Sequence, residues 1–203
     1  MIKQLTIDDS KQFCDLIIDM YSNLENLEWF SPMPYDLDNV KSIIENPRFF
    51  IIGYFQDGVL CAVSSFDYKC GKLIGKIDLP KECNTNKLVE IGFTMVHSNY
   101  RGNGLMKKMV AYLTNKAKED GFEWIFGKVH KDNLASAKSF LNNGFNKFSH
   151  YNKPVSITDF RLLASQQFFS EIGKINAQKT LSKTKNTDSE IMVNYDIIIK
   201  KLF

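Results

Sequence analysis

The sequence has few of the features that mark membrane, disulfide-rich or low-complexity proteins. Its 203 residues include only 4 Cys, 5 Pro and 11 Gly, and no hydrophobic run approaches the ~18 residues that a bilayer-spanning helix needs. The amino terminus alternates in hydropathy and then turns acidic, which is not typical of a signal peptide. The cysteines show no C-x-x-C pair and no close His partner, which favours buried thiols in a reducing compartment over a zinc site or a disulfide framework; they are Cys14, Cys61, Cys70 and Cys83. We therefore expect a soluble, cytoplasmic protein without a bound metal and without a membrane partner.

The charge balance argues against a nucleic-acid-binding protein. Lys and Arg number 26 against 23 Asp and Glu, so the net charge is only +3, and nucleic-acid binding needs a concentrated basic face. The lysine-rich stretch at 174–190 has no accompanying aromatic pattern, which indicates a solvated polar segment. The composition, 44% hydrophobic and 13% aromatic, is sufficient for a sizeable core.

The first half of the chain alternates between strand-like and helix-like patterns. Asp57 and Gly58, between two apolar runs, are a strong signal for a β-hairpin. Apolar residues at helical spacing follow potential capping residues at 8–10 and predict an amphipathic helix. In order, the sequence predicts a strand at 1–7, this helix as far as 24, an irregular stretch at 25–37, a short helix at 38–46, strands at 49–55 and 60–68, and a loop at 70–87.

The second half has a clearer strand–helix–strand rhythm. The segment 123–129 is apolar on both faces, as expected of a strand buried in a parallel pair. In order, the sequence predicts a strand at 88–96, a helix at 104–118 ended by Gly121, the strand at 123–129, a helix at 133–143 ended by Gly144, a strand from 145 to 150, a helix-compatible stretch at 160–172, and a last strand at 193–200. This order argues for an α/β fold. We expect a single domain, 1–203, with an inserted subelement at about 151–190, which is too long for a simple loop.

The segment 96–106, VHSNYRGNGLM, places a tight glycine-containing turn between a strand and a helix. Glycines allow positive φ and let a ligand approach the backbone closely. The amides of 102–106 are the unpaired donors of a helix amino terminus, an arrangement suited to a pyrophosphate. Arg101, Lys107 and Lys108 add positive charge nearby. On the glycines alone, a plain strand-to-helix turn is an equal alternative.

This segment resembles motif A of the GNAT superfamily of N-acetyltransferases, which bind acetyl-CoA through Q/R-x-x-G-x-G/A. Gly102 and Gly104 match the glycine positions, whereas Asn99 stands where the family prefers Gln or Arg, and Ser98 stands where many members have Pro.

A second segment, 133–145, is similar to motif B of the family, N-x(6)-Y-x(3)-G-F. Asn133, Gly144 and Phe145 fit the pattern. Phe140 replaces the Tyr whose hydroxyl often protonates the departing CoA sulfur in this family, so another donor must act or the thiolate must leave unaided. A thiol has a pKa near ~8.5, so unaided departure is chemically tolerable.

The resemblance implies a mixed α/β (α+β) fold with a mostly antiparallel central sheet, splayed parallel central strands and flanking helices, over about 1–150 and the last strand. It implies acetyl-CoA as co-substrate and direct acetyl transfer to a primary amine of a small-molecule or peptide acceptor. The backbone near Met95 and Val96 would pair with pantetheine and polarise the thioester. The expected cofactor-binding residues are Met95, Val96, Arg101, Gly102, Asn103, Gly104, Leu105, Met106, Asn133 and Phe140.

Glu90 is the expected general base, because its place in the strand resembles that of a glutamate in the histone acetyltransferase branch of the family. Strand alternation predicts that Val89, Ile91, Phe93 and Met95 share one face and that Glu90 lies on the other, with Gly92 and Thr94. A solvated or salt-bridged strand glutamate is the alternative. His130 is a second candidate base, and His97 is expected to have a packing or capping role.

By the same resemblance, the acceptor site is expected at Glu28, Trp29, Phe30 and Tyr35 together with the 151–190 insertion; ordinary packing of these aromatics is the alternative. The apolar stripe at 160–172 is compatible with a lid, a homodimer contact or simple packing. The competing function is a catalytically weak acyl-CoA-binding regulatory module, for which Phe140 is the main support.

Overall fold

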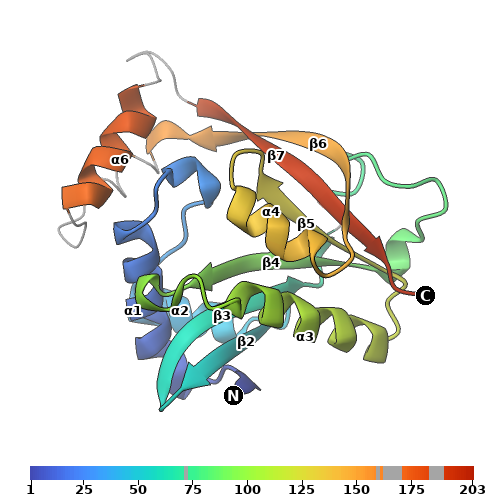
Figure 1. Ribbon diagram of the computed structural model, residues 1–203, viewed down its shortest axis with the longest axis horizontal. Helices are drawn as coiled ribbons and strands as arrows, with labels where there is room; N and C mark the ends of the chain where they lie inside the picture. Colours follow the sequence, from blue (N-terminus) through green and yellow to red (C-terminus); the bar gives the residue numbers. More distant parts are fainter. Residues whose placement is uncertain (71–72, 159–160, 162–170, 183–189) are drawn as a thin grey trace.

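The computed structural model describes residues 1–70, 73–158, 161, 171–182 and 190–203. In these residues seven strands form one sheet, in the order β1-β2-β3-β4-β5-β7-β6, with helices on both faces (Figure 1). The strands are β1 (Ile2–Gln4), β2 (Phe49–Gln56), β3 (Val59–Asp67), β4 (Leu88–Val96), β5 (Trp124–His130), β6 (Asn146–Ser156) and β7 (Glu190–Lys201). All neighbouring strands are antiparallel except β4 and β5, which confirms the predicted mixed fold.

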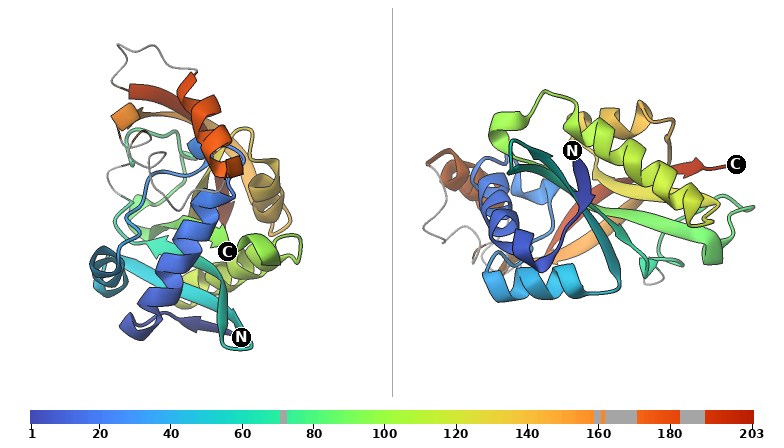
Figure 2. Two further views of the ribbon diagram at one scale, coloured as in Figure 1. Left: turned by 90° about the vertical axis from the view of Figure 1, so that its left-hand side faces the viewer. Right: turned by 90° about the horizontal axis from the view of Figure 1, so that it is seen from below.

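The helices are α1 (Ser10–Ser22), α2 (Leu37–Glu45), α3 (Leu105–Glu119), α4 (Leu134–Leu141) and α6 (Glu171–Ser182), with short 3-10 turns η2 (Leu27–Trp29) and η5 (Ser98–Tyr100). In Figure 2, α1 and α2 cover one face of the sheet and α3 and α4 cover the other. No helix in the described part of the chain is long and apolar enough to cross a membrane.

Most predicted elements lie within a residue or two of their observed bounds, and three differ in a way that has a physical reason. The first strand is shorter than 1–7, because the residues after Thr6 turn into a 3-10 segment. The strand predicted at 145–150 extends to Ser156, because β7 pairs with it along its whole length. The polar stretch at 174–190 is in part the helix α6, whose buried Ala177 belongs to the core cluster around α1.

The helix predicted at 160–172, with its possible lid or dimer contact, lies largely outside the described residues.

Each face of the sheet has its own hydrophobic cluster. On the α1 face, Phe13, Ile17 and Tyr21 recur at helical spacing and are fully buried, so burial of this stripe holds α1 on the sheet. On the other face, Met109 and Leu113 of α3 pack in a second cluster. The chain thus builds two layers of helix around one sheet, and the candidate site lies where these layers meet an interruption in that sheet.

The interruption is the divergence of β4 from β5. Their ladder runs from Leu88–Trp124 only as far as Ile91–Gly127, although β4 continues to Val96 and β5 to His130. A register shift in the β3–β4 ladder occurs at the same level, where two residues of β4, Gly92 and Phe93, oppose one residue of β3. A β-bulge bends its strand and increases the local twist, so the bulge turns β4 away from β5.

The bulge also overturns the predicted facing of β4. Val89 and Ile91 pack in the cluster around α3, whereas Phe93 and Met95 pack in the cluster around α1. The prediction that these four side chains share one face is therefore wrong beyond Ile91. Glu90 does lie opposite Val89 and Ile91, but it does not share its face with Thr94, because the extra residue of the bulge reverses the alternation.

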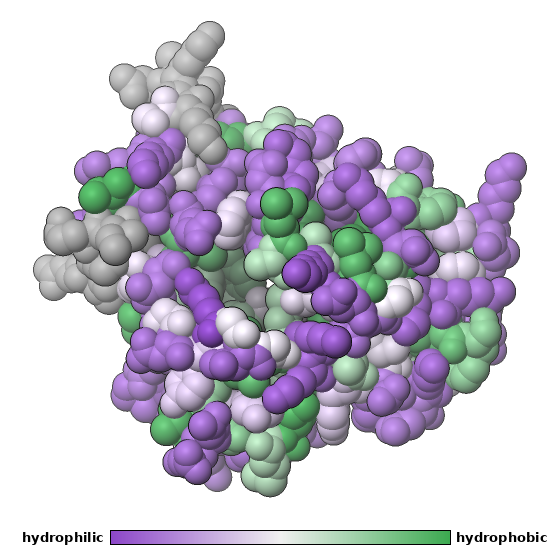
Figure 3. Space-filling view, in the orientation of Figure 1, coloured by the Kyte–Doolittle hydropathy of each residue, from purple (hydrophilic) through white to green (hydrophobic). Residues whose placement is uncertain are grey.

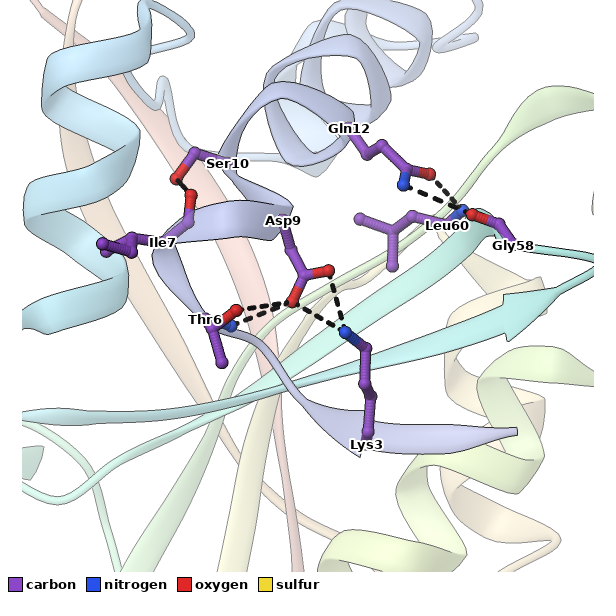
Figure 4. A network of polar contacts seen from close by, with 8 residues as sticks. All are labelled: Lys3, Thr6, Ile7, Asp9, Ser10, Gln12, Gly58 and Leu60. Carbon is purple, nitrogen blue, oxygen red and sulfur yellow. Dashed lines mark hydrogen bonds and ion pairs between the residues drawn. The ribbon is translucent and has the colours of Figure 1, made fainter.

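A polar network fastens the start of α1 to the sheet edge (Figure 4). Lys3 Nζ lies 2.9 Å from Asp9 Oδ1, and the Thr6 amide donates to Asp9 Oδ2 at 2.9 Å. Burial opposes ionisation of Asp9, but these partners together lower the pKa of its carboxyl. Further along the helix, Gln12 accepts from the Leu60 amide at 2.8 Å, next to the hairpin turn.

That hairpin confirms the Asp57-Gly58 prediction. Both residues have positive φ, 50° and 79°, as a two-residue turn that matches strand twist requires.

We predict that Gly127→Ala lowers the free energy of unfolding by roughly 1–3 kcal/mol through overpacking, because an added Cβ would lie 2.8 Å from the Phe140 ring. Urea denaturation measures this loss. In the double variant Gly127→Ala/Phe140→Leu the crowding is relieved, so the two single losses should not add. Additive losses would show that the ring contact is not the cause.

Candidate active site

A cleft of about 580 Å³ lies beside the diverging part of β4. Its walls come from Thr94, Met95 and Val96 of β4, from the end of α1 and η2, from the first turn of α3, and from α4. In the space-filling view the surface is hollowed here, with a largely hydrophilic rim (Figure 3). The cleft therefore brings together the two motif segments that the sequence singled out.

The turn before α3 has the backbone conformation that its glycines predict. Gly102 and Gly104 have φ values of 82° and 69°, and Gly104 is the amino-terminal cap of α3. A Cβ built on either glycine meets no atom within 4 Å. The amides of the first turn of a helix have no partner within the helix, and the helix dipole makes this end positive. The turn is thus an open anion-binding corner on the wall of the cleft.

Basic side chains add to this positive potential. Arg101, Lys107 and Lys138 all line the cleft. Arg101 is held in place by its hydrogen bonds to the carbonyl oxygens of Asn23, at 2.8 Å, and Val96, at 3.3 Å. Because Asn23 ends α1, this guanidinium links α1 to the turn.

Asp19 of α1 fastens the same turn more directly. Its two carboxylate oxygens accept from the Ser98 amide and the Ser98 hydroxyl, each at 2.6 Å. The adjacent His97 caps η5, since its Nδ1 accepts from the Asn99 amide at 3.2 Å, which confirms its predicted capping role. Charge-assisted hydrogen bonds of this length are strong, so α1 fixes the position of the turn.

The structure brings most, but not all, of the predicted cofactor residues onto the cleft. Asn103 and Phe140 are not among the described lining residues. Asn103 is exposed and donates to the Tyr100 carbonyl oxygen at 3.2 Å. Phe140 is buried under Gly127, with its ring centroid 5.1 Å from that of Phe145. The predicted cofactor residues that do line the cleft are Met95, Val96, Arg101, Gly102, Gly104, Leu105, Met106 and Asn133.

The predicted acceptor residues are divided in the same way. Trp29 and Phe30 line the cleft, whereas Glu28 and Tyr35 do not. Tyr35 lies partly buried against the core cluster around α1. Glu28 turns to the end of β5, where its Oε2 lies 3.6 Å from Nε2 of His130.

His130 is buried, and its Nδ1 accepts from the Asp132 amide at 3.2 Å. Its Nε2 lies 3.6 Å from Oε2 of Glu28, which is longer than a hydrogen bond. The second candidate base therefore lies at the end of β5, beside the carboxylate of Glu28.

Glu90 is not on the cleft wall among the described residues. It lies at the closed end of the divergence, opposite Phe126, and is only 3% exposed. Its Oε1 is 2.8 Å from Nζ of Lys128. Burial raises the pKa of Glu90, and the charge of Lys128 opposes that rise. The salt-bridged state was the predicted alternative to a catalytic role, and it is present.

Sequence reasoning placed Asn133, at the start of α4, on the site but missed most of the α4 residues and the α1 residues that line the cleft. The additional lining residues include Met20, Leu24, Glu25, Ser136, Lys138, Ser139 and Asn142. The helix that starts at Asn133 was predicted, and a helical wheel would have placed Ser136 and Ser139 on one side of it. Nothing in the sequence indicates that this side faces the turn before α3.

A family model for the acetyltransferase (GNAT) domain matches residues 1–146. The chain belongs to the GNAT acetyltransferase family. No curated protein matches it, but many solved structures do. The resemblance drawn from motifs A and B is therefore confirmed, and the protein is an acetyltransferase.

Solved relatives share the fold at low sequence identity. A ribosomal-protein-alanine N-acetyltransferase from Brucella melitensis is 17% identical with a TM-score of 0.66, and 99% of each chain is covered. An N-acetyltransferase from Staphylococcus aureus Mu50 is 13% identical with a TM-score of 0.66, covering 100% of this chain and 98% of that one. The yncA protein from Salmonella typhimurium, whose structure contains acetyl-CoA as its cofactor, is 14% identical with a TM-score of 0.64, covering 100% and 94%.

We predict that Asp19→Ala lowers the free energy of unfolding by about 1.5–3 kcal/mol, the usual range for hydrogen bonds to a charged group. Asp15→Ala on the same helix is the matched control, because Asp15 is exposed and forms a surface i,i+4 ion pair with Lys11. The control should stay within about 0.5 kcal/mol of the wild type. Equal losses in urea denaturation would mean that Asp19 does not fasten the turn.

Proposed function

We propose that this acetyltransferase moves an acetyl group from acetyl-CoA directly to a primary amine of its acceptor, with 1–203 acting as one domain. The observation that supports this best is the open, positive corner at Gly102 and Gly104. It lies beside the part of β4 that no longer pairs with β5. We also propose a cytoplasmic location, on the ground that all four cysteines are free thiols.

The residues present fit acetyl-CoA in two respects. The amides before α3, with Arg101, Lys107 and Lys138 around them, suit a diphosphate. Beyond Ile91 the backbone of β4 has no ladder partner on the β5 side, so its polar groups near Met95 and Val96 are available to an extended amide-containing arm such as pantetheine.

When bound, acetyl-CoA supplies the activated acetyl group. The β4 amides then act as hydrogen-bond donors to the carbonyl oxygen as negative charge develops there. The attacking amine must be neutral, and a free alkylammonium with a pKa near ~10.4 must first lose a proton. The nitrogen forms the new C–N bond, and the C–S bond breaks with its electron pair leaving on sulfur. The nitrogen gives up its second proton as the amide forms, and this loss balances the proton that sulfur takes up.

Glu90 is our proposed acceptor for the ammonium proton. Because its carboxylate lies behind the closed end of the strands and off the cleft wall, the proton reaches it through an intervening group such as a water molecule. A carboxyl whose pKa is raised by burial is better matched to this task at neutral pH than an exposed one.

Phe140 supports a competing function, a catalytically weak acyl-CoA-binding module. The ring has no hydroxyl and is buried under Gly127, so it does not protonate a leaving thiolate. The decisive experiment is release of free CoA thiol by purified protein with a panel of small amines and peptide amino termini. Amine-dependent thiol release supports the enzyme, and acetyl-CoA binding without turnover of any amine supports the module.

We predict that Gly102→Val weakens acetyl-CoA binding at least ~10-fold in calorimetry, a loss of about 1.4 kcal/mol. A β-branched residue at a φ of 82° is strained, and its side chain would stand in the anion-binding corner. Gly58→Val is the matched control, since Gly58 also has positive φ and open space around its Cβ position but lies in the β2–β3 hairpin. Unchanged affinity in Gly102→Val would contradict the assignment of the corner.

We predict that Glu90→Gln lowers turnover more at neutral pH than at high pH, where the acceptor amine is neutral without help. The measurement is the pH dependence of kcat/KM with one amine from the panel that is turned over. A loss of equal size at every pH would remove Glu90 from the proton transfer.

A further inference from the structure

Five charged side chains gather on the α1 face of the sheet, behind the point where β4 and β5 diverge. Glu90 Oε1 and Lys128 Nζ are 2.8 Å apart. Asp67 of β3 stands opposite Glu90 in the ladder and forms a two-pronged ion pair with Arg48. Lys153 of β6 is the fifth, and the charge of Glu90 opposes the lowering of its pKa by burial.

Burial makes the ionised form of Glu90 costly. Its side chain is only 4% exposed, and removal of a carboxylate from water strongly favours the neutral acid unless a partner compensates. Accordingly burial is the main cause of its raised pKa, and Asp67, a like charge, adds to the rise. A cation beside this glutamate therefore favours the ionised form, which is the form that can accept a proton.

Lys128 provides that cation because it lies next to the end of the β4–β5 ladder. It is the first β5 residue after Gly127, the last residue of β5 that pairs with β4. Its neighbours Gly127 and Val129 face α4 and the α3 cluster, so its own side chain points to the face that Glu90 occupies. The Lys128 side chain is 26% exposed, so it is still in contact with water.

The other groups near Glu90 have partners of their own or are uncharged, although the charge of Arg48 also lowers the pKa of Glu90. Arg48 is directed to Asp67, with Nε 2.7 Å from Oδ1. Lys153 donates to the Ser31 hydroxyl at 3.1 Å, and burial lowers its pKa. Cys70 is a buried thiol whose pKa is raised to about 11, first by burial and then by the charge of Glu90, so it is neutral.

We propose that Lys128 is a positioning residue of this acetyltransferase, which holds Glu90 as an ionised carboxylate at the closed end of the splayed strands. Among the described residues it is the cation in direct contact with Glu90. The proposal rests on the proposed function, in which Glu90 takes the ammonium proton. Lys128 itself exchanges no proton. Its positive charge keeps Glu90 in the ionised form that can accept the ammonium proton.

The test combines a direct titration of Glu90 with a rate profile. The carboxyl carbons of glutamates labelled with ¹³C are followed by NMR against pH, and the resonance that Glu90→Gln removes identifies Glu90. In Lys128→Met the titration midpoint of Glu90 should rise by roughly 1–3 pH units, because a neighbouring opposite charge usually lowers it by that amount. If Lys128→Met does not fold, Lys128→Gln is used in its place. The acid limb of kcat/KM should move to higher pH by the same amount.

Two further variants separate this effect from a loss of structure. Lys128→Arg keeps the charge and should restore most of both profiles. Lys87→Met is the matched control, because it breaks an ion pair of similar length, 2.7 Å to Glu123, between exposed side chains, and it should change neither the Glu90 midpoint nor the acid limb.

The outcomes distinguish this inference from the proposed function. An unchanged midpoint in Lys128→Met and Lys128→Gln overturns the role of Lys128, whatever the rates are. A midpoint that rises while the acid limb stays in place overturns the catalytic use of the pair and the assignment of Glu90. A midpoint that rises in a protein that turns over no amine supports the control of Glu90 by Lys128 and overturns the proposed enzyme.

Discussion

The two-against-one bulge in β4 is the constraint on which the rest of the site depends. Gly92 is needed there, because a Cβ at this position would lie 2.7 Å from Ser65 Oγ, and the extra residue turns the strand away from β5 at the level of Ile91. A sheet that continued in register would pair the backbone of β4 with β5 and leave no edge for a ligand. The interruption therefore creates both the cleft and the unpaired backbone beside it.

The same interruption separates two electrostatic environments. On the cleft side, the first turn of α3 and the basic residues Arg101, Lys107 and Lys138 make a positive corner. Behind the closed end of the divergence, off the cleft wall, the buried Glu90 forms an ion pair with the partly exposed Lys128. The divergence of β4 and β5 therefore lies near both the positive corner and the Glu90–Lys128 pair.

Local sequence patterns were sufficient for the elements and for the anion-binding turn. Gly102 and Gly104 indicated positive φ because few other residues tolerate it, and both have it. The bulge was not predictable, since one extra residue leaves no mark in an alternating apolar strand. The α6 helix was missed because its composition is polar and only a few positions, such as Ala177, are buried.

The site residues that sequence reasoning missed depend on contacts between distant segments. Lys128 meets Glu90 only because β4 and β5 are parallel neighbours, and Asp19 meets Ser98 only because α1 crosses the end of β4. Asn103 and Phe140 were predicted from motif segments and Glu90 from its place in a strand, and none of the three is among the described residues that line the cleft. A motif specifies which residue types accompany a turn, whereas side-chain orientation depends on the packing around it.

The position of α1 has a consequence for how the two halves of the site communicate. Asp19 grips the turn before α3, and two residues later the Tyr21 hydroxyl donates to the Ser31 carbonyl oxygen and accepts from the Met33 amide, in the segment that follows Trp29 and Phe30. One rigid helix thus braces both regions. If a ligand bound at the turn before α3 makes α1 more rigid, the segment after Trp29 and Phe30 becomes more ordered before the second ligand binds. Each ligand then raises the affinity of the protein for the other, and thermodynamic linkage requires that the two increases be equal.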